Sequence, residues 1–285
     1  MPEVAFVNGR FMPLADAVVS IEDRGFQFAD GVYEVVASYG GRPFAMEPHL
    51  HRLEHSLAAL RLGLDIRAYG LEAFVREGIT RSGFAETLVY IQITRGTAPR
   101  HHEFPVAGTQ PTVVMTVKEL RRPAAQLYQT GVKVVSTPDL RWKRCDIKST
   151  SLLANILAKQ QAFEAGAFEA LLVDGEGRVN EGSSTSAFCV RQGVIWTAPA
   201  GTHILPSITR GLLLDLARGL GLPVREEFTT LQEYCQADEV FLAGTTTEAM
   251  PVVRIDDQQV GGGSPGPVTA RLRQAFLDYV AAGKW

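Results

Sequence analysis

The sequence predicts an α+β protein whose mixed or antiparallel sheets lie in two domains. Candidate strands and helices follow one another without the regular strand–helix–strand rhythm of parallel-sheet proteins. The glycine-rich signatures of dinucleotide-binding and P-loop sites are both absent from the 285 residues. A linker is expected at Arg121-Arg122-Pro123, because proline restricts the preceding residue to extended conformations. The predicted domains are therefore residues 1–120 and residues 121–285.

Turn signals and hydrophobic spacing define the elements of the first domain. Asn8-Gly9 separates two short apolar runs, which is the strongest short hairpin signal, and Gly40-Gly41 separates residues 33–39 from 42–45 in the same way. Apolar residues at helical spacing predict a helix over residues 48–62, and a second helix is expected over 69–82. Alternating β-branched residues predict strands over 87–95 and 111–118.

The second domain is expected to mix strands and helices down to the C-terminus. A hairpin turn is predicted at Gln192-Gly193. The expected strands are 131–136, 169–173, 186–191, 194–197, 239–243 and 250–255, and the expected helices are 149–165, 207–220 and 268–282.

Composition narrows the possible partners of this protein. A net charge of −3 and a pI of about 6.1 argue against a nucleic-acid binder, which usually carries a basic face. No basic segment followed by an apolar run begins the chain, and no apolar stretch approaches the roughly 18 residues of a membrane span. Cys145, Cys189 and Cys235 are odd in number and form no C-x-x-C pair, which suits a reducing cytoplasm.

Two residues carry the first indication of chemistry. Lys148 stands among short polar and apolar residues, and Glu181 precedes a glycine and small hydroxyl residues. A lysine amine can hold an aldehyde as a Schiff base, and an acid can keep a pyridine nitrogen protonated so that the ring accepts electrons. Pyridoxal phosphate enzymes need both groups. From position alone, however, a solvated lysine and the end of a hairpin explain the two residues better.

Lys148 and Glu181 belong to a larger pattern of four segments. These are residues 22–35, residues 94–105, the stretch from Arg141 through Lys148 to Ser184, and residues 204–210 together with 245–248. Their order and spacing resemble class IV (fold-type IV) pyridoxal phosphate aminotransferases nearly end to end, and most of all the D-amino acid aminotransferase subgroup. The resemblance implies a smaller N-terminal α/β sandwich and a larger C-terminal domain with a pseudo-barrel of mixed strands. It also implies a homodimer whose active site is shared between subunits.

The resemblance assigns roles around the cofactor. Lys148 holds the cofactor aldehyde and then moves the proton between the substrate Cα and C4′ of the cofactor, a role that suits a lysine whose pKa burial lowers. Glu181 pairs with the pyridine nitrogen, and Leu205 packs against the ring. The implied phosphate ligands are Arg52, Ile208, Thr209, Thr245 and Thr246. Independently, Pro206-Ser207 before an apolar helix is a plausible helix N-terminus, which binds phosphate through its free N–H groups.

The resemblance also implies a trap for the substrate carboxylate. Tyr33, Arg100 and His102 match its members, the last two contributed by the neighbouring subunit, and Ser184 is a further substrate-binding residue. Arginine can hold a carboxylate through two parallel hydrogen bonds. On composition alone, the basic cluster after Pro99 would be an exposed loop. Leu153 stands where branched-chain members usually carry a tyrosine, which counts against that subgroup.

These residues predict a cytoplasmic transaminase that acts on D-alanine, D-glutamate or D-aspartate, with 2-oxoglutarate or pyruvate as acceptors, by a ping-pong mechanism. Four alternatives stay open: a branched-chain L-amino acid transaminase, an (R)-amine transaminase, an aminodeoxychorismate lyase and a non-catalytic cofactor-binding protein. A zinc site at His51 and His55 is not favoured, because no third ligand has convincing spacing. No metal, membrane or nucleic-acid partner is expected.

Overall fold

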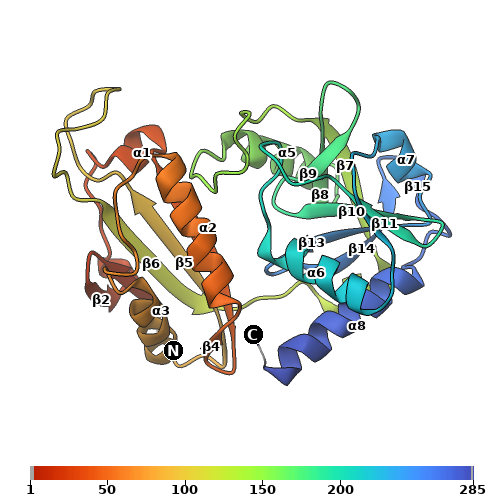
Figure 1. The fold of residues 1–285 in the computed structure, drawn as a ribbon, viewed down its shortest axis with the longest axis horizontal. Helices are drawn as coiled ribbons and strands as arrows, with labels where there is room; N and C mark the ends of the chain where they lie inside the picture. The colour runs from red at the N-terminus through yellow and green to blue at the C-terminus, as the bar shows by residue number, and fades with distance from the viewer. Residues whose placement is uncertain (1–2, 284) are drawn as a thin grey trace. The chain divides into compact units, whose positions relative to one another are not determined.

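The computed structural model describes residues 3–283 and 285, which form two compact units (Figure 1). The first unit contains the chain up to Arg121 together with Ile147–Ser151, and the second contains Arg122–Asp146 and the chain from Leu152 onward. The chain therefore passes between the units three times. The sequence-based domains, 1–120 and 121–285, remain a prediction that treats residues 147–151 as part of the second domain.

The first unit is built on a six-stranded antiparallel sheet in the order β2-β1-β6-β5-β3-β4. At the first hairpin, Asn8 and Gly9 have φ angles of 46° and 90°, the left-handed conformation that a two-residue hairpin turn requires. The strands are β1 (Val4–Val7), β2 (Arg10–Pro13), β3 (Gly31–Tyr39), β4 (Arg42–Pro43), β5 (Glu86–Thr94) and β6 (Thr112–Glu119).

Two helices, α2 (Met46–Ala59) and α3 (Leu71–Ser82), lie beside this sheet (Figure 1). Leu50, Leu53 and Leu57 recur at helical spacing on α2 and are buried in one core with residues of the strands. This confirms the amphipathic pattern that predicted the helix, and burial of each such side chain contributes about 1.5–3 kcal/mol. A short 3-10 helix, η1 (Leu14–Asp16), and a five-residue helix, α1 (Arg24–Phe28), lie in the connection from β2 to β3.

Residues Ile147–Ser151 complete the first unit although they follow a strand of the second. Ile147 is buried in the core beneath α2. Ser149 forms an antiparallel bridge with Val32 of β3, and the Thr150 N–H donates to the Gly31 carbonyl at 3.0 Å. The helix predicted over 149–165 is therefore wrong at its start. These residues pair with β3 instead, and α5 (Leu153–Glu164) begins only after them.

The second unit contains a nine-stranded mixed sheet in the order β12-β11-β10-β13-β14-β7-β8-β9, with β15 paired to β14. Three pairs are parallel, β11 with β12, β14 with β7 and β7 with β8. Only residues 183–185 separate β9, at one end of the order, from β10 near its middle, so the sheet must curl. The bounds are β7 (Val132–Pro138), β8 (Glu169–Val173), β9 (Val179–Gly182), β10 (Ser186–Arg191), β11 (Val194–Thr197), β12 (Val224–Glu226), β13 (Glu239–Gly244), β14 (Glu248–Ile255) and β15 (Gln258–Gln259).

Two long helices of the second unit begin where side chains satisfy their first N–H groups. The Ser207 hydroxyl accepts from the Arg210 N–H at 3.2 Å, and the Glu239 carboxylate accepts from the Val268 and Thr269 N–H groups at 2.9 and 2.8 Å. Besides α5, the helices are α4 (Ala125–Thr130), α6 (Ile208–Gly219), α7 (Leu231–Cys235) and α8 (Pro267–Ala282). Within residues 3–283 and 285, no helix combines the length and apolar character that a membrane crossing needs.

Candidate active site

Lys148 is fixed by its backbone against strand β3 and helix α2. Its carbonyl accepts from the Tyr33 N–H at 2.9 Å, and its own N–H donates to the Ser56 hydroxyl at 3.1 Å. The half-buried side chain places Nζ 4.2 Å from the centre of the Tyr33 ring. The face of an aromatic ring attracts an amine in its charged form and still packs against it when it is neutral. Lys148 and Tyr33, two of the predicted site residues, therefore lie together.

Arg52 lies one turn of α2 before Ser56 and is held by a buried carboxylate. Its Nε and Nη2 donate to the two oxygens of Glu34 at 2.7 and 2.8 Å, and His49 Nδ1 lies 2.7 Å from one of them. Burial alone would raise the pKa of Glu34, but Arg52 and His49 outweigh it and lower that pKa to about 2. Glu34 therefore stays ionised and orients the guanidinium that the sequence assigns to a phosphate group.

His49 belongs to this cluster rather than to a metal site. Burial lowers the pKa of its imidazole, because the charged form loses solvation that Glu34 only partly replaces. His51, by contrast, is exposed and lies 3.0 Å from Glu47. Among the described residues, no three His, Cys, Asp or Glu side chains are arranged to hold a metal ion.

Arg100 and His102 lie on the loop between β5 and β6 and share one contact surface. The Arg100 guanidinium lies 4.8 Å from the centre of the Phe28 ring, and the His102 imidazole lies 5.6 Å from the same centre in an edge-on arrangement. Both side chains are exposed. The structure thus brings Arg100 and His102 together on Phe28, and the contacts described for them do not reach Tyr33.

In the second unit, Glu181 is buried at the end of β9 and shares an arginine with a second acid. Arg141 Nη1 forms a short ion pair with Glu181, while Arg141 Nε and Nη2 bind both oxygens of Asp139 at 2.9 and 2.8 Å. The Leu205 N–H also donates to the Glu181 oxygens at 3.2 and 3.3 Å. The predicted neighbours Glu181 and Leu205 are therefore in direct contact.

Sharing one arginine leaves the two carboxylates with different acidity. Burial would raise the pKa of Asp139, but the two bonds from Arg141 and one from Asn180 lower it. Burial raises the pKa of Glu181, and its single bond to Arg141 only partly offsets this effect. Glu181 is therefore more basic than an ordinary carboxylate. A group of this kind can share a proton with a ring nitrogen.

A second buried carboxylate, Glu169 of β8, organises the segment that follows Glu181. Its side chain is 0% exposed and accepts from the hydroxyl of Ser183 in a short bond. It also accepts from the Ser184 hydroxyl at 2.7 Å and the Ser184 N–H at 3.3 Å. Ser184, a predicted substrate-binding residue, is thus exposed but fixed from beneath.

Apart from Arg52, the residues assigned to the cofactor phosphate lie at two chain turns of the second unit. Ile208 and Thr209 are the first two residues of α6, so their N–H groups are among those that a helix leaves without internal partners. Thr245 and Thr246 occupy the turn between β13 and β14. Gly244, just before this turn, lies against Ser184 and Thr185. The Thr245–Thr246 turn therefore adjoins the segment that follows Glu181.

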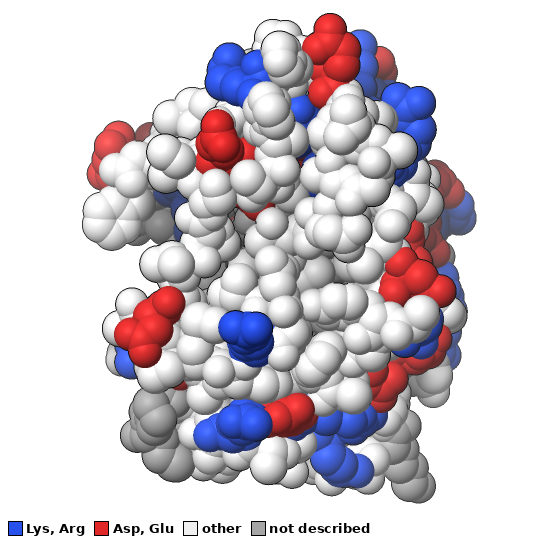
Figure 2. All heavy atoms as spheres, turned by 90° about the vertical axis from the view of Figure 1, so that its left-hand side faces the viewer, with Lys and Arg blue, Asp and Glu red and all other residues white. Residues whose placement is uncertain are grey.

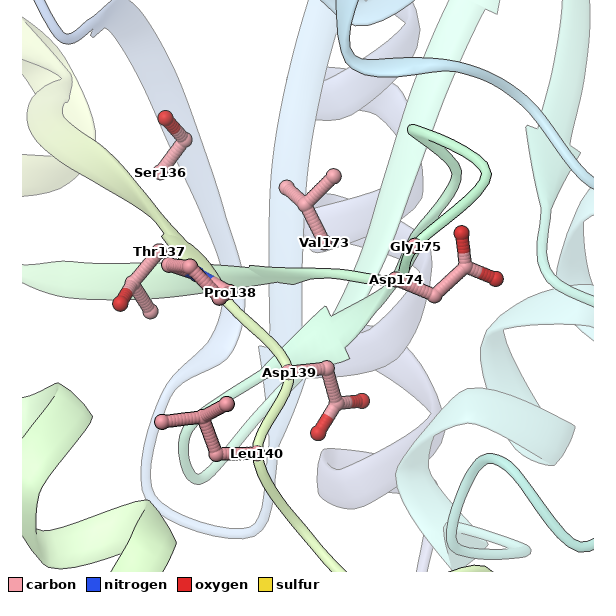
Figure 3. Close-up of a pocket in the computed structure, with 8 residues that line it drawn as sticks. All are labelled: Ser136, Thr137, Pro138, Asp139, Leu140, Val173, Asp174 and Gly175. Carbon is pink, nitrogen blue, oxygen red and sulfur yellow. The ribbon is translucent and has the colours of Figure 1, made fainter.

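A hollow of about 540 Å³ opens beside Asp139 at the ends of β7 and β8 (Figure 3). Its two carboxylates are already engaged, because Asp139 binds Arg141 and Asp174 binds Arg178 at 2.8 Å. The hollow is lined by Ser136, Thr137, Pro138, Asp139, Leu140, Val173, Asp174 and Gly175. The hollow therefore adjoins the site through Asp139, which binds Arg141.

Comparison with known proteins decides the family. The profile described as amino-transferase class IV matches residues 31–255, which is most of the chain. The chain belongs to the aminotransferase class IV family. A D-alanine aminotransferase of Bacillus licheniformis is 41% identical over 96% of this chain and 95% of its own length, and one of Staphylococcus haemolyticus is 38% identical over 96% and 97%.

Solved structures agree with this class IV assignment. A T.th. branched-chain amino acid aminotransferase with pyridoxamine 5′-phosphate has a TM-score of 0.90 at 28% identity, covering 99% of this chain and 95% of its own. A branched-chain amino acid aminotransferase from Escherichia coli has a TM-score of 0.86 at 26% identity, covering 97% and 94%. The predicted fold-type IV architecture, with a curled mixed sheet in the C-terminal part, is confirmed.

Several residues that support this class IV site escaped the sequence analysis. Glu34, Arg141, Asp139 and Glu169 are all buried or half-buried acids or bases that hold predicted residues in place. Glu34 and Glu169 lie on the apolar strands β3 and β8, and Asp139 and Arg141 follow β7. An ionisable residue within such a run was the available signal, because a buried charge needs a partner.

Proposed function

We propose that this protein is a pyridoxal phosphate-dependent transaminase that moves the amino group between D-amino acids and 2-oxo acids. It is an enzyme of the D-amino acid transaminase type. D-alanine, D-glutamate and D-aspartate are the proposed donors, and 2-oxoglutarate and pyruvate are the proposed acceptors. Relatives named D-alanine aminotransferases that match nearly the whole chain at 38–41% identity support this specificity. The reaction follows a ping-pong order.

The residues that the resemblance assigns to the cofactor have the chemistry that it needs. The observation that carries the fit is the buried Glu181 carboxylate next to Leu205, because a carboxylate there can accept from the N–H of a protonated ring nitrogen. Leu205 would lie against the ring. Arg52, the N–H groups of Ile208 and Thr209, and the hydroxyls of Thr245 and Thr246 would hold the phosphate. When bound, pyridoxal phosphate supplies an electron sink for the carbanion left at the substrate Cα.

In the first unit, Lys148 would transfer the proton and Tyr33 would bind the substrate. As a neutral amine, Lys148 Nζ would carry the proton from the substrate Cα to C4′ of the cofactor in the first half-reaction and in the opposite direction in the second. Its position over the Tyr33 ring keeps the amine near the tyrosine that would contact the substrate carboxylate. Arg100 and His102 would complete the carboxylate trap, and Ser184 would be a further substrate-binding residue.

The first test is a titration of the purified protein, followed through the visible absorbance of the bound cofactor. D-alanine alone should bleach the band, and 2-oxoglutarate should restore it. The Lys148→Ala variant should lose at least about 1,000-fold in turnover, since nucleophile and proton carrier disappear together. Near wild-type turnover by this variant would overturn the proposal. Bleaching by L-leucine or (R)-1-phenylethylamine instead would support the alternative branched-chain or amine transaminases.

We propose a homodimer whose subunits share the active site. Helix α5 carries Leu153, Ile156 and Leu157 at helical spacing, and these side chains are 71%, 59% and 63% exposed. Such a row of exposed apolar residues is typical of a surface that a partner covers. Figure 2 shows a different face, on which uncharged residues also cover much of the surface. Light scattering should give twice the chain mass of 31.0 kDa, and Leu157→Glu should shift it toward one chain.

We also propose that the protein works in the cytoplasm. Cys145, Cys189 and Cys235 are all unpaired thiols in the structure. Burial raises the pKa of Cys145 to about 11 and that of Cys189 to about 12, so both stay protonated and unreactive. Free thiols of this kind are typical of proteins in a reducing compartment. Fractionation of the source cells with an antibody against the protein would test the location.

A further inference from the structure

The loop between β5 and β6 carries Arg100 and His102 but has little structure of its own. Residues 98–110 contain no helix or strand. Loops of this length without secondary structure are uncommon and often functional. The position of the two side chains must therefore be fixed by contacts from outside the loop.

The base of the loop is fixed by backbone pairing with the residues before α1. Asp23 forms an antiparallel bridge with Thr97, and the Arg24 N–H donates to the Gly96 carbonyl at 2.9 Å. Gly96 has φ +93°, and a Cβ there would lie 2.0 Å from the carbonyl oxygen of Gln110. Only glycine fits at this position. The two ends of the loop are thus held close together.

The far part of the loop is fixed by the side chain of Arg24. This guanidinium is 3% exposed and donates from Nη1 to the His101 carbonyl at 2.6 Å and from Nη2 to the His102 carbonyl at 3.4 Å. Its Nε donates to Asp30 at 2.8 Å, which fixes the plane of the fork. Arg24 therefore binds the backbone of His102, a residue of the proposed carboxylate trap, and that of its neighbour His101.

Phe28, one turn after Arg24 on α1, supports the side chains of the same loop. Arg24 itself lies 4.9 Å from the centre of the Phe28 ring, and the ring also contacts Arg100 and His102. The five-residue helix α1 thus holds the loop in two ways. Arg24 binds the loop backbone, and Phe28 contacts the side chains of Arg100 and His102. Hydrogen bonds from a charged donor are stronger than those between neutral groups.

We propose that Arg24 is a positioning residue for substrate specificity, and that it sets the preference for carboxylate-bearing substrates by holding residues 101–102 of this loop. The inference rests on the proposed function, because Arg100 and His102 are taken as the carboxylate trap. Arg24 touches neither substrate nor cofactor. Its effect should therefore appear in carboxylate recognition and leave the chemistry at Lys148 unchanged.

The test compares two reagents that trap the bound cofactor through the same aminooxy group. Aminooxyacetate carries a carboxylate, and hydroxylamine does not. Wild-type protein should react faster with aminooxyacetate, measured as the second-order rate of the absorbance change. Arg24→Lys should lower that rate about tenfold, equivalent to one lost charged hydrogen bond, while the rate with hydroxylamine stays within about twofold. The KM for D-alanine should rise by a similar factor.

Controls separate positioning from a general loss of structure. Arg76→Lys, in an exposed ion pair with Glu72 on α3, should change neither rate. If Arg24→Lys does not fold, Phe28→Leu should give the same selective loss, because it removes the ring beneath both trap residues. A parallel fall in both rates, or an unchanged preference, would overturn the inference. Failure of the proposed function would show already in the wild type, as missing transamination or no preference for aminooxyacetate.

Discussion

Glu34 in the first unit and Glu181 in the second are both buried carboxylates paired with an arginine, yet their pKa values move in opposite directions. Glu34 accepts two bonds from Arg52 and a contact from His49, and its pKa falls to about 2. Glu181 accepts one bond from Arg141, which is otherwise occupied by Asp139, and its pKa is raised. An arginine that serves one buried acid lowers the pKa of that acid, whereas Glu181, which receives only part of a shared arginine, keeps a raised pKa.

The largest effect should come from removing the shared arginine. Arg141→Met leaves Glu181 and Asp139 buried without their common cation, so the free energy of unfolding should fall by about 3–5 kcal/mol. Urea unfolding measures the change. Arg144→Met, which removes an exposed ion pair with Asp146, is the matched control and should cost less than about 1 kcal/mol. Equal losses of unfolding free energy in Arg141→Met and Arg144→Met would contradict the expected difference between the buried and the exposed ion pairs.

Glu34 should make stability depend on pH with the opposite sign to Glu181, because the pKa of Glu34 is lowered and that of Glu181 is raised. Its folded pKa of about 2 lies below its ordinary value of 4.5, so the unfolded chain binds the proton first as the pH falls. The stabilisation, about 3 kcal/mol, is fully present above pH 4.5 and is lost between that pH and about 2. Glu34→Gln should lose it at pH 7 and should flatten the stability curve between pH 5 and 3. If the stability of the wild type does not change between pH 5 and 3, the pairing of Glu34 with Arg52 and His49 does not lower the pKa of Glu34.

Asp139→Asn should convert the divided pair into one that resembles Glu34–Arg52. The negative charge of Asp139 raises the pKa of Glu181, and the substitution removes that charge while keeping the shape. We expect a stability loss of about 2 kcal/mol from the weakened bonds to Arg141. The acid limb of the kcat/KM profile for D-alanine should move to lower pH. An acid limb that moves to higher pH, or not at all, would show that Glu181 does not respond to Asp139.

The smallest stability effect, with a large effect on activity, is expected for Glu181→Gln. Arg141 keeps its two bonds to Asp139, and a neutral amide relieves the cost of burying the carboxylate. The free energy of unfolding should stay within about 1 kcal/mol of wild type. Turnover of D-alanine should fall about 100-fold or more, because the ring nitrogen loses its acid partner. A variant that keeps full turnover would remove Glu181 from the site.

Much of the fold could be predicted where the signal is local. The strands Glu169–Val173, Ser186–Arg191 and Val194–Thr197 have the predicted bounds, because alternating residues end at strong turn signals such as Gln192-Gly193. The five-residue helices Arg24–Phe28 and Leu231–Cys235 were missed, since a helix of this length completes too few turns to show a hydrophobic period.

The parts of the site that could not be predicted depend on residues far apart in the chain. Arg52 is 18 residues from Glu34, and Arg141 is 40 residues from Glu181, so neither pairing has a local pattern. The resemblance named the residues expected at the site, but only the fold shows which acid each arginine binds. The start of the helix predicted over 149–165 failed for the same reason, because residues 147–150 pair with β3 more than a hundred positions earlier.

The return of residues 147–151 to the first unit has a consequence for how the protein is made. A ribosome synthesises the whole of Met1–Arg121 before it makes the segment that completes that unit, and strand β7 is synthesised in between. During that interval the edge of β3 at Val32 lacks its partner, and Ile147 is missing from the core. The first unit therefore becomes complete only when the nascent chain has delivered Lys148, so that its final folding step coincides with the arrival of the proposed Schiff-base amine.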